Sequence, residues 1–220
     1  MADVEMGKGA SSMKALTAVD IQRILLAYGY AATNEYGEIV CAYIELLLRW
    51  NRKVALTTVT EPQEVVRFHF GESLFGMAKG GMQNGRLADL GSGAGFPGAP
   101  IAIAKPELTA VLMESNGKKA AFLEEVRREL GLKNVTVHHG RAEQVPPTAA
   151  FDFVTVRAVG ERQRWLEWAA ERMTVGARML LWVNADGAAE AGRASGWKWV
   201  ERAKIPGTND RFVVIGEREA

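Results

Sequence analysis

Closely spaced glycines stand near the middle of this chain, in the run Ala88-Asp89-Leu90-Gly91-Ser92-Gly93-Ala94-Gly95-Phe96-Pro97-Gly98. The run follows a short apolar stretch and precedes a helical pattern. In an open α/β sheet, ligands bind where a strand gives way to a helix in this manner. Glycines at such a turn let backbone N–H groups come close to a ligand and tolerate positive φ angles. The pattern therefore predicts a ligand-binding loop.

Two classes of ligand compete for this loop. From Gly93 the letters fit the dinucleotide fingerprint G-x-G-x-x-G, in which a pyrophosphate lies on the helix N-terminus. From Asp89 they read acidic-x-Gly-x-Gly-x-Gly, a form used by S-adenosylmethionine-dependent methyltransferases. The Asp89 carboxylate would repel a pyrophosphate but could lie near the cationic methionine end of S-adenosylmethionine, beside Gly91 and Gly95. We expect S-adenosylmethionine as the cofactor, with a dinucleotide-binding oxidoreductase or sensor as the alternative.

Further polar positions fall at the ends of predicted strands. Glu114 closes LTAVLME, 25 residues after Asp89, where a second strand of such a fold delivers an acid to ribose hydroxyls. Ala142 and Glu143 follow NVTVHH closely, where they could line the adenine. Arg157 ends FDFVTVR at the same edge, and its two-pronged guanidinium could clamp a carboxylate or a phosphate.

The composition narrows the classes of partner. The chain has 27 Lys and Arg against 26 Asp and Glu, a formal charge of +1, so RNA binding would need a local basic patch. The single cysteine, Cys41, rules out a disulfide framework within the chain. We expect no metal site, because the adjacent His138 and His139 cannot easily converge on one ion. No stretch approaches the roughly 18 uninterrupted apolar residues of a membrane span, so we expect a cytoplasmic protein with no membrane partner.

These residues need elements that hold them at one edge. Residues 1–14 are predicted to be a disordered start, residues 15–80 a helical region and residues 81–220 the ligand-binding domain. Helices are expected around 21–28, around 39–48, from Glu61-Pro62 onward, after residue 97 and over 118–130. Strands are expected over 86–91, 108–114, 134–139, 151–158, 177–184, 197–205 and 211–217. The alternation predicts an α/β fold with a mainly parallel, doubly wound sheet that ends in an antiparallel hairpin.

Six segments, in this order, resemble the RsmG (GidB) family of 16S ribosomal RNA guanine-N7 methyltransferases: WNRKVALTTV, RFHFGESL, ADLGSGAGFPGAPIAI, LMESNGKKAAFLEEV, HHGRAEQV and FDFVTVRAV. The resemblance covers roughly residues 20 to 216. It implies a Rossmann-like class I methyltransferase, with a seven-stranded, mostly parallel sheet, helices on both faces and a small N-terminal helical region. It implies methylation of N7 of a guanosine in the 530-loop region, with 16S ribosomal RNA or the small ribosomal subunit as partner. A small-molecule methyltransferase is a further alternative.

Position by position, the resemblance implies contacts between S-adenosylmethionine and Gly91, Phe96, Ala142, Glu143 and Arg157. The family's segment with a histidine followed by Asp-Ser is matched by His69-Phe70-Gly71-Glu72-Ser73. This chain departs from the family pattern at four positions: Glu72 and Glu114 stand for Asp, Ala55 stands for Asn, and Asn184 stands for the Lys of a Lys-Gly pair.

The expected chemistry needs little acid or base catalysis. Guanine N7 already holds a lone pair and loses no proton on methylation, so positioning is the main requirement, and orientation effects can supply about 7–11 kcal/mol. No residue is therefore assigned as catalytic, and Arg157, Glu72 and His69 are the candidates. Basic side chains are expected to bind the RNA: Arg52, Lys53, Arg67, Arg162, Arg164 and Arg211.

Overall fold

The computed structural model describes residues 16–148, 150–157, 160 and 162–220, so the predicted disordered start lies outside the described residues. The α-helices are α1 (Ala18–Leu26), α2 (Asn34–Asn51), α3 (Pro62–Val65), α4 (Glu72–Lys79), α5 (Gly98–Ala104), α6 (Gly117–Glu129), α7 (Arg162–Arg172) and α8 (Ala185–Ala191). A π-helical turn, η1 (Val66–Gly71), joins α3 to α4, and η2 (Ala142–Gln144) is a short 3₁₀ turn. The strands are β1 (Gly85–Leu90), β2 (Leu108–Glu114), β3 (Val135–His139), β4 (Phe151–Arg157), β5 (Met173–Val183), β6 (Trp197–Lys204) and β7 (Phe212–Arg218).

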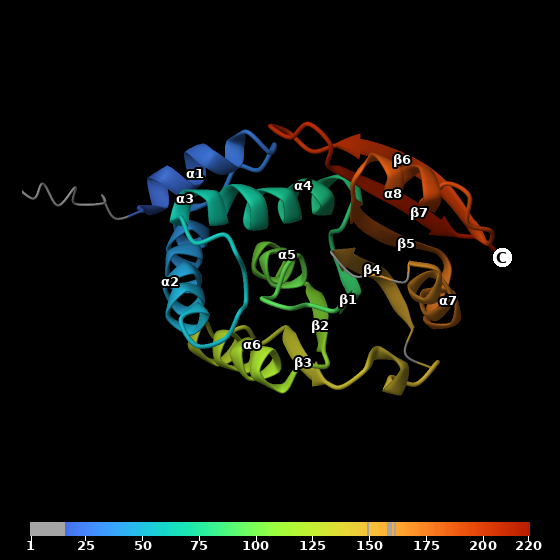
Figure 1. Ribbon diagram of the computed structural model, residues 1–220, viewed down its shortest axis with the longest axis horizontal. Coiled ribbons are helices and arrows are strands. Elements are labelled where there is room, and N and C mark those ends of the chain that lie inside the picture. The colour runs from blue at the N-terminus through green and yellow to red at the C-terminus, as the bar shows by residue number, and fades with distance from the viewer. Residues whose placement is uncertain (1–15, 149, 158–159, 161) are drawn as a thin grey trace, which may run out of the picture.

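One seven-stranded sheet runs through the molecule in the order β3-β2-β1-β4-β5-β7-β6 (Figure 1). Every neighbouring pair from β3 to β5 is parallel, and β7 is antiparallel to both β5 and β6. The predicted mainly parallel sheet and the final hairpin are confirmed. The hairpin, however, folds back so that β7 lies between β5 and β6. The carboxyl ends of β1, β2, β3 and β4 share the edge where ligands bind in such sheets.

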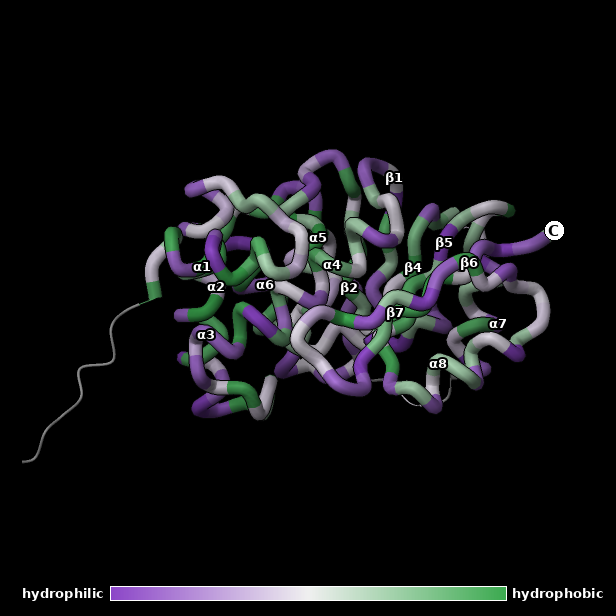
Figure 2. Tube along the Cα trace, turned by 90° about the horizontal axis from the view of Figure 1, so that it is seen from above, coloured by the Kyte–Doolittle hydropathy of each residue, from purple (hydrophilic) through white to green (hydrophobic). Residues whose placement is uncertain are grey.

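Both faces of the sheet are covered by helices. In Figure 1 the helices α1 to α6 gather on the left and α7 and α8 on the right. Two apolar cores result, and along β7 the side chains of Val213 and Ile215 belong to one core while Val214 belongs to the other. Strands buried on both faces read as continuous apolar runs, which is why these strands were recognisable from the sequence. Figure 2 shows apolar stretches mainly in the interior of the trace and hydrophilic ones mainly in the outer turns.

The N-terminal helices begin at side chains that cap them. Thr17 and Asp20 form a capping box at α1, and the Thr33 hydroxyl accepts from the Tyr36 N–H at α2. The helix predicted to open at Glu61-Pro62 does so, with Pro62 in its first turn. It continues to Lys79 through the π-helical turn η1, which the sequence did not predict.

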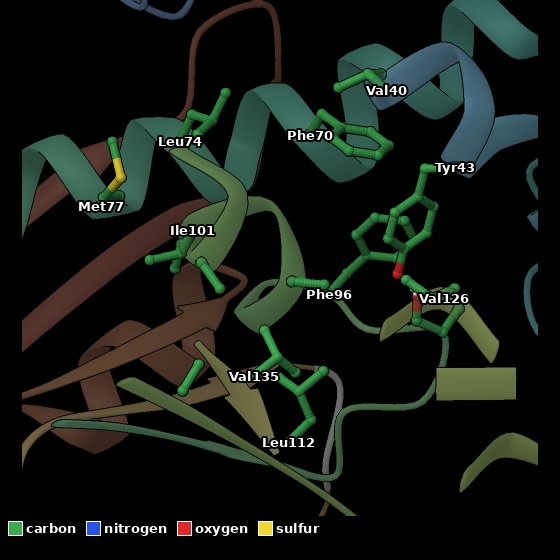
Figure 3. Packing of buried hydrophobic residues seen from close by; sticks show 14 of the residues in the cluster. Val40, Tyr43, Phe70, Leu74, Met77, Phe96, Ile101, Leu112, Val126 and Val135 are labelled. Carbon is green, nitrogen blue, oxygen red and sulfur yellow. Dashed lines mark hydrogen bonds between the residues drawn. The ribbon is translucent and has the colours of Figure 1, made fainter. Parts of the chain in front are cut away.

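The helical region and the sheet share one core. The ring of Tyr43 on α2 lies 5.3 Å from the ring of Phe70 and 5.6 Å from that of Phe96, measured between centroids (Figure 3). Its hydroxyl donates a 2.7 Å hydrogen bond to the carbonyl of Ala94, in the glycine loop. The helical region therefore packs against the glycine loop and holds its backbone through Tyr43.

Candidate functional site

The glycine loop leaves β1 in a conformation that favours glycine. Gly91, Gly93 and Gly95 have φ angles of 66°, 57° and 88°, in the left-handed region that L side chains rarely adopt. A Cβ at Gly95 would collide with the Tyr43 hydroxyl, whereas a Cβ at Gly93 would meet nothing closer than a carbonyl oxygen 3.8 Å away. The loop therefore packs tightly on one side and leaves space for a ligand on the other.

Glu114 is tied to this loop from the end of β2. Its Oε2 accepts from the Gly93 N–H at 2.8 Å and its Oε1 from the Asn116 N–H at 2.7 Å. The residue is 8% exposed. Each oxygen keeps a second lone pair, so the carboxylate can still accept from a ligand hydroxyl. The contact with ribose that we expected for Glu114 stays a prediction.

Two cavities meet at Gly91. One, of about 280 Å³, is lined by Gly91, Met113, Ser115, Gly140, Arg141, Ala142, Glu143, Arg164 and Trp165. The other, of about 220 Å³, is lined by Leu56, Thr57, His69, Gly91, Ser92, Gly93, Ala94, Phe96, Lys119 and Arg157. Together they fall in the range of about 300–1,000 Å³ typical of small-molecule sites. The two cavities share Gly91 in their linings.

The turn η2 borders the cavity of about 280 Å³. The indole N–H of Trp168 donates to the Ala142 carbonyl at 2.8 Å, which holds this turn against α7. Glu143 forms an ion pair with Arg164, whose guanidinium lies 5.4 Å from the ring centroid of Trp165. Ala142 and Glu143 thus lie where the sequence placed them, at the carboxyl edge after β3.

Asp89 lies beneath the loop and lines neither cavity. It is 0% exposed, and its Oδ1 accepts from the Thr155 hydroxyl at 2.7 Å. Its Oδ2 makes no well-formed hydrogen bond with the described residues. Burial raises the pKa of Asp89 to about 6, against the Thr155 hydroxyl, which favours the ionised form. The expected contact between Asp89 and the cofactor stays a prediction.

A buried ion cluster joins three distant segments beside the cavity of about 220 Å³, which Arg157 lines. Glu72 of α4 is 0% exposed, and its Oε2 lies 3.1 Å from Arg157 Nη2 and 2.7 Å from Arg211 Nη2. Arg157 Nη2 also donates to the Phe68 carbonyl at 2.7 Å. Burial raises the pKa of Glu72, while the two guanidiniums lower it. The Nη1 group of Arg157 is buried without a hydrogen-bond partner among the described residues, and so is a donor available to a ligand in the cavity.

His69 faces the same cavity as a neutral ring. Its Nε2 lies 2.9 Å from the Thr57 hydroxyl, and its ring stacks on Phe96 at 4.4 Å between centroids and 17° between planes. Burial, with the nearby charges of Arg157 and Arg211, lowers the pKa of His69 to about 3. An imidazole with this pKa carries no charge near neutral pH and serves as a flat, polar surface.

Sequence reasoning missed Asn51 and Thr57. The Asn51 side chain donates to the Thr57 carbonyl at 2.8 Å and accepts from the N–H groups of Leu56 and Thr57 at 2.9 and 3.0 Å. This fixes the loop that carries Thr57 to His69. Both residues lie within the segment WNRKVALTTV, and its resemblance to the family is the signal that could have indicated them. Ala55, which stands for the Asn of the family pattern, is exposed in the same loop.

The basic candidates lie on several elements. Arg52 and Lys53 are exposed at the end of α2, and Arg67 is paired with Glu64 on the helical run. Arg162 opens α7, and its side chain lies outside the described residues. Arg164 and Arg211 border the site through their ion pairs described above. At the position of the family's Lys, the Asn184 side chain accepts from the Gly187 N–H at 2.9 Å and caps α8.

Across 16–148, 150–157, 160 and 162–220, no three His, Cys, Asp or Glu side chains are grouped so that they could hold a metal ion. None of the helices in this part of the chain combines the length and apolarity that crossing a bilayer requires.

Known proteins similar to this chain agree with the geometry. The family model described as GidB, rRNA small subunit methyltransferase G, matches residues 37–195. Ribosomal RNA small subunit methyltransferase G of Xylella fastidiosa (strain 9a5c) is 49% identical over 118 residues, 54% of this chain and 55% of that protein, so the match spans about half of that relative. The protein of the same name from Roseiflexus castenholzii is 39% identical over 165 residues, 73% of this chain and 70% of that protein.

A solved structure shows the same fold. The chain resembles a SAM-dependent methyltransferase from Aquifex aeolicus with a TM-score of 0.57 and 17% identity, covering 66% of this chain and 88% of that one. This neighbour bears out the Rossmann-like methyltransferase fold, which the sheet order already displays. Taken with the family match, these observations show that the chain belongs to the rRNA small subunit methyltransferase G (GidB) family.

Proposed function

We propose that this protein transfers a methyl group from S-adenosylmethionine to N7 of a guanosine in the 530-loop region of 16S ribosomal RNA. The observation that carries the proposal is the pair of cavities on either side of Gly91, with the Glu114 carboxylate bonded to the Gly93 N–H beside them. Family membership supports the choice of ribosomal RNA as the substrate class. The naked RNA or the small ribosomal subunit would be the partner, and the cytoplasm the place of action.

The residues present fit S-adenosylmethionine. The open side of the loop at Gly93 admits a ligand that a side chain would exclude, and Phe96 closes the methionine side. The unpartnered Nη1 of Arg157 is a donor suited to the methionine carboxylate. Glu114 would accept from the ribose hydroxyls, with Ala142 and Glu143 along the adenosine. The buried negative charge of Asp89 would favour a cationic methionine end behind the glycines.

The role of this chain in the reaction would be positioning. S-adenosylmethionine supplies an electrophilic methyl whose bond to sulfur breaks as the bond to guanine N7 forms, leaving S-adenosylhomocysteine. Since N7 attacks with a lone pair, no side chain has to remove a proton. His69, stacked on Phe96 and oriented by Thr57, offers a neutral flat surface to the target base. Glu72 and Arg211 hold Arg157 in place, and such alignment can supply about 7–11 kcal/mol of the barrier.

Calorimetric titration with S-adenosylhomocysteine and, separately, with NADH tests the cofactor. We expect micromolar binding of the first and no signal from the second. Binding of NADH alone would replace this proposal by the dinucleotide alternative. Mass mapping of methylated guanosine in 16S ribosomal RNA after incubation with S-adenosylmethionine tests the target. Methyl transfer to a small molecule with none to RNA would favour a small-molecule methyltransferase.

A further inference from the structure

A separate hollow of about 510 Å³ lies behind the wall of the cavity that His69 and Arg157 line. We call it the α1–η1 groove. It is formed by Arg23, Ile24 and Tyr28 of the α1 end, by Arg67 and Phe68 of η1, and by the turn at Pro206. Figure 1 shows that turn, between β6 and β7, reaching over to the end of α1 above the helical run. Three segments far apart in the sequence therefore build this groove together.

The groove and the proposed reaction site lie on opposite sides of η1. Phe68 lines the groove, and the next residue, His69, lines the cofactor cavity, so the π-helical turn η1 is the shared wall. The Phe68 carbonyl accepts from Arg157, and the Arg211 guanidinium lies 5.9 Å from the Phe68 ring centroid. A π-helical turn inside a helix is frequent at functional sites. A ligand in the groove would contact the same turn that positions Arg157.

The lining matches the chemistry of a single-stranded RNA segment. The partly exposed ring of Phe68 supplies aromatic surface, while Tyr28 is 8% exposed and forms the floor of the groove. The side chains of Arg23 and Arg67 are 75% and 49% exposed. Unstacked RNA bases bind aromatic rings and guanidinium planes, and arginines bind the phosphates. Each arginine makes one surface ion pair, with Asp20 and Glu64, and such pairs are worth only about 0–1 kcal/mol. A phosphate can therefore compete for these guanidiniums.

A comparable hollow elsewhere has aromatic residues but no arginine. A cavity of about 520 Å³ lies between α2, the end of α5 and the segment 130–134 before β3, at the sheet edge opposite the glycine loop. Its lining contains Lys133 and Glu35 but no arginine. Size alone does not distinguish the α1–η1 groove, whereas its arginines and its shared wall with the cofactor cavity do.

We propose that the α1–η1 groove binds a nucleotide of the RNA substrate that flanks the methylated guanosine, with its base on Phe68 and its phosphate on Arg67 and Arg23. The proposal rests on the proposed function, because it assumes that the substrate is RNA. It adds an RNA-binding surface outside the cofactor cavity and assigns to η1 the task of separating the target base from its neighbour.

Two variants with matched controls test the groove. Arg67→Ala removes a guanidinium paired at 2.6 Å with Glu64, and Arg127→Ala removes one paired at 2.8 Å with Glu124 at the same i,i+3 spacing on α6. Ala27→Glu adds a negative charge to the exposed groove lining, and Ala27→Gln adds the same bulk without charge. Affinity for a 16S ribosomal RNA fragment containing the 530 loop is measured by fluorescence anisotropy with saturating S-adenosylhomocysteine, over a salt series.

We expect Arg67→Ala and Ala27→Glu to weaken RNA binding several-fold and both controls to leave it unchanged. For Arg67→Ala, the slope of log affinity against log salt should shrink by about 0.7 for the lost phosphate contact. Affinity for S-adenosylhomocysteine should be unchanged in all four variants, which also shows that they fold. Equal affinities for Arg67→Ala and Arg127→Ala would overturn the proposal.

Other outcomes separate this proposal from the proposed function. A wild-type chain that binds the RNA fragment but leaves 16S ribosomal RNA unmethylated would refute the methyl transfer, while the contrast between Arg67→Ala and Arg127→Ala would still decide the groove. A wild-type chain that binds neither the RNA fragment nor the small ribosomal subunit overturns both. Variants that bind the fragment normally but the intact small subunit weakly would assign the groove to a ribosomal protein and overturn the RNA assignment.

Discussion

The buried carboxylate of Asp89 should cost the protein stability at neutral pH. Burial raises its pKa from 3.8 to about 6, a difference of about 2 units. Each unit corresponds to about 1.4 kcal/mol, so the ionised side chain destabilises the fold by about 3 kcal/mol relative to the protonated one. The folded state binds this proton more tightly than the unfolded chain. The stabilising contribution is therefore complete below pH 3.8 and is lost as the pH rises through about 6.

Asp89→Asn isolates this effect. The amide oxygen can still accept from the Thr155 hydroxyl, and no charge is buried at any pH. The free energy of unfolding of the variant, minus that of the wild type, should rise by about 3 kcal/mol between about pH 4 and about pH 7. The cost of an unpaired amide N–H is the same at every pH and shifts only the offset. Urea unfolding at a series of pH values measures the difference, and a difference independent of pH would refute this reasoning.

Substitutions of Asp89 also test whether its charge contributes to cofactor binding. If its charge favours the cationic cofactor, Asp89→Asn and Asp89→Ala should bind S-adenosylmethionine more weakly by calorimetry, although Asp89→Asn gains relative stability at neutral pH. Dinucleotide binding should be unchanged or improved. Tighter S-adenosylmethionine binding by either variant would reject this role for Asp89.

Three further changes follow from the site. Burial and two guanidiniums lower the pKa of His69 to about 3, so the folded protein resists protonation of this ring. Its stabilising contribution is complete above pH 6.5 and is lost as the pH falls. Between pH 6.5 and about pH 4.5 the wild type should lose about 3 kcal/mol relative to His69→Gln in urea unfolding. Equal acid sensitivity would contradict the neutral buried ring. Glu72→Gln leaves buried guanidinium charge uncompensated and should cost about 3–5 kcal/mol, against less than about 1 kcal/mol for the surface pair member Glu125→Gln, by thermal or urea unfolding. Gly95→Ala should abolish S-adenosylhomocysteine binding, because a Cβ at Gly95 would collide with the Tyr43 hydroxyl and displace the glycine loop. Gly176→Ala, at a similar φ of 83° in open space, should bind S-adenosylhomocysteine normally in the same titration.

Local patterns in the sequence determined much of this fold. The central strands were predictable because most of their residues are buried and they read as short apolar runs bounded by turn residues, whereas the edge strand β6 alternates buried and exposed residues. The glycine loop was predictable because closely spaced glycines mark backbone that other residues cannot adopt. From these, Gly91, Gly93, Glu114 and Arg157 were expected at one edge of the sheet. There the structure places Gly91, Gly93 and Arg157 in the cavity linings, and Glu114 accepts from the Gly93 N–H.

Only the tertiary structure decided what depends on distant residues. The insertion of β7 between β5 and β6, the cluster of Glu72 with Arg157 and Arg211, and the α1–η1 groove each join segments that no local period connects. The enclosure of Asp89 beneath its own loop is of the same kind, since Thr155 and Gly98 come from other elements. Apolar periodicity and turn chemistry act over a few residues, whereas strand order and buried charge pairing are settled by packing across the whole chain.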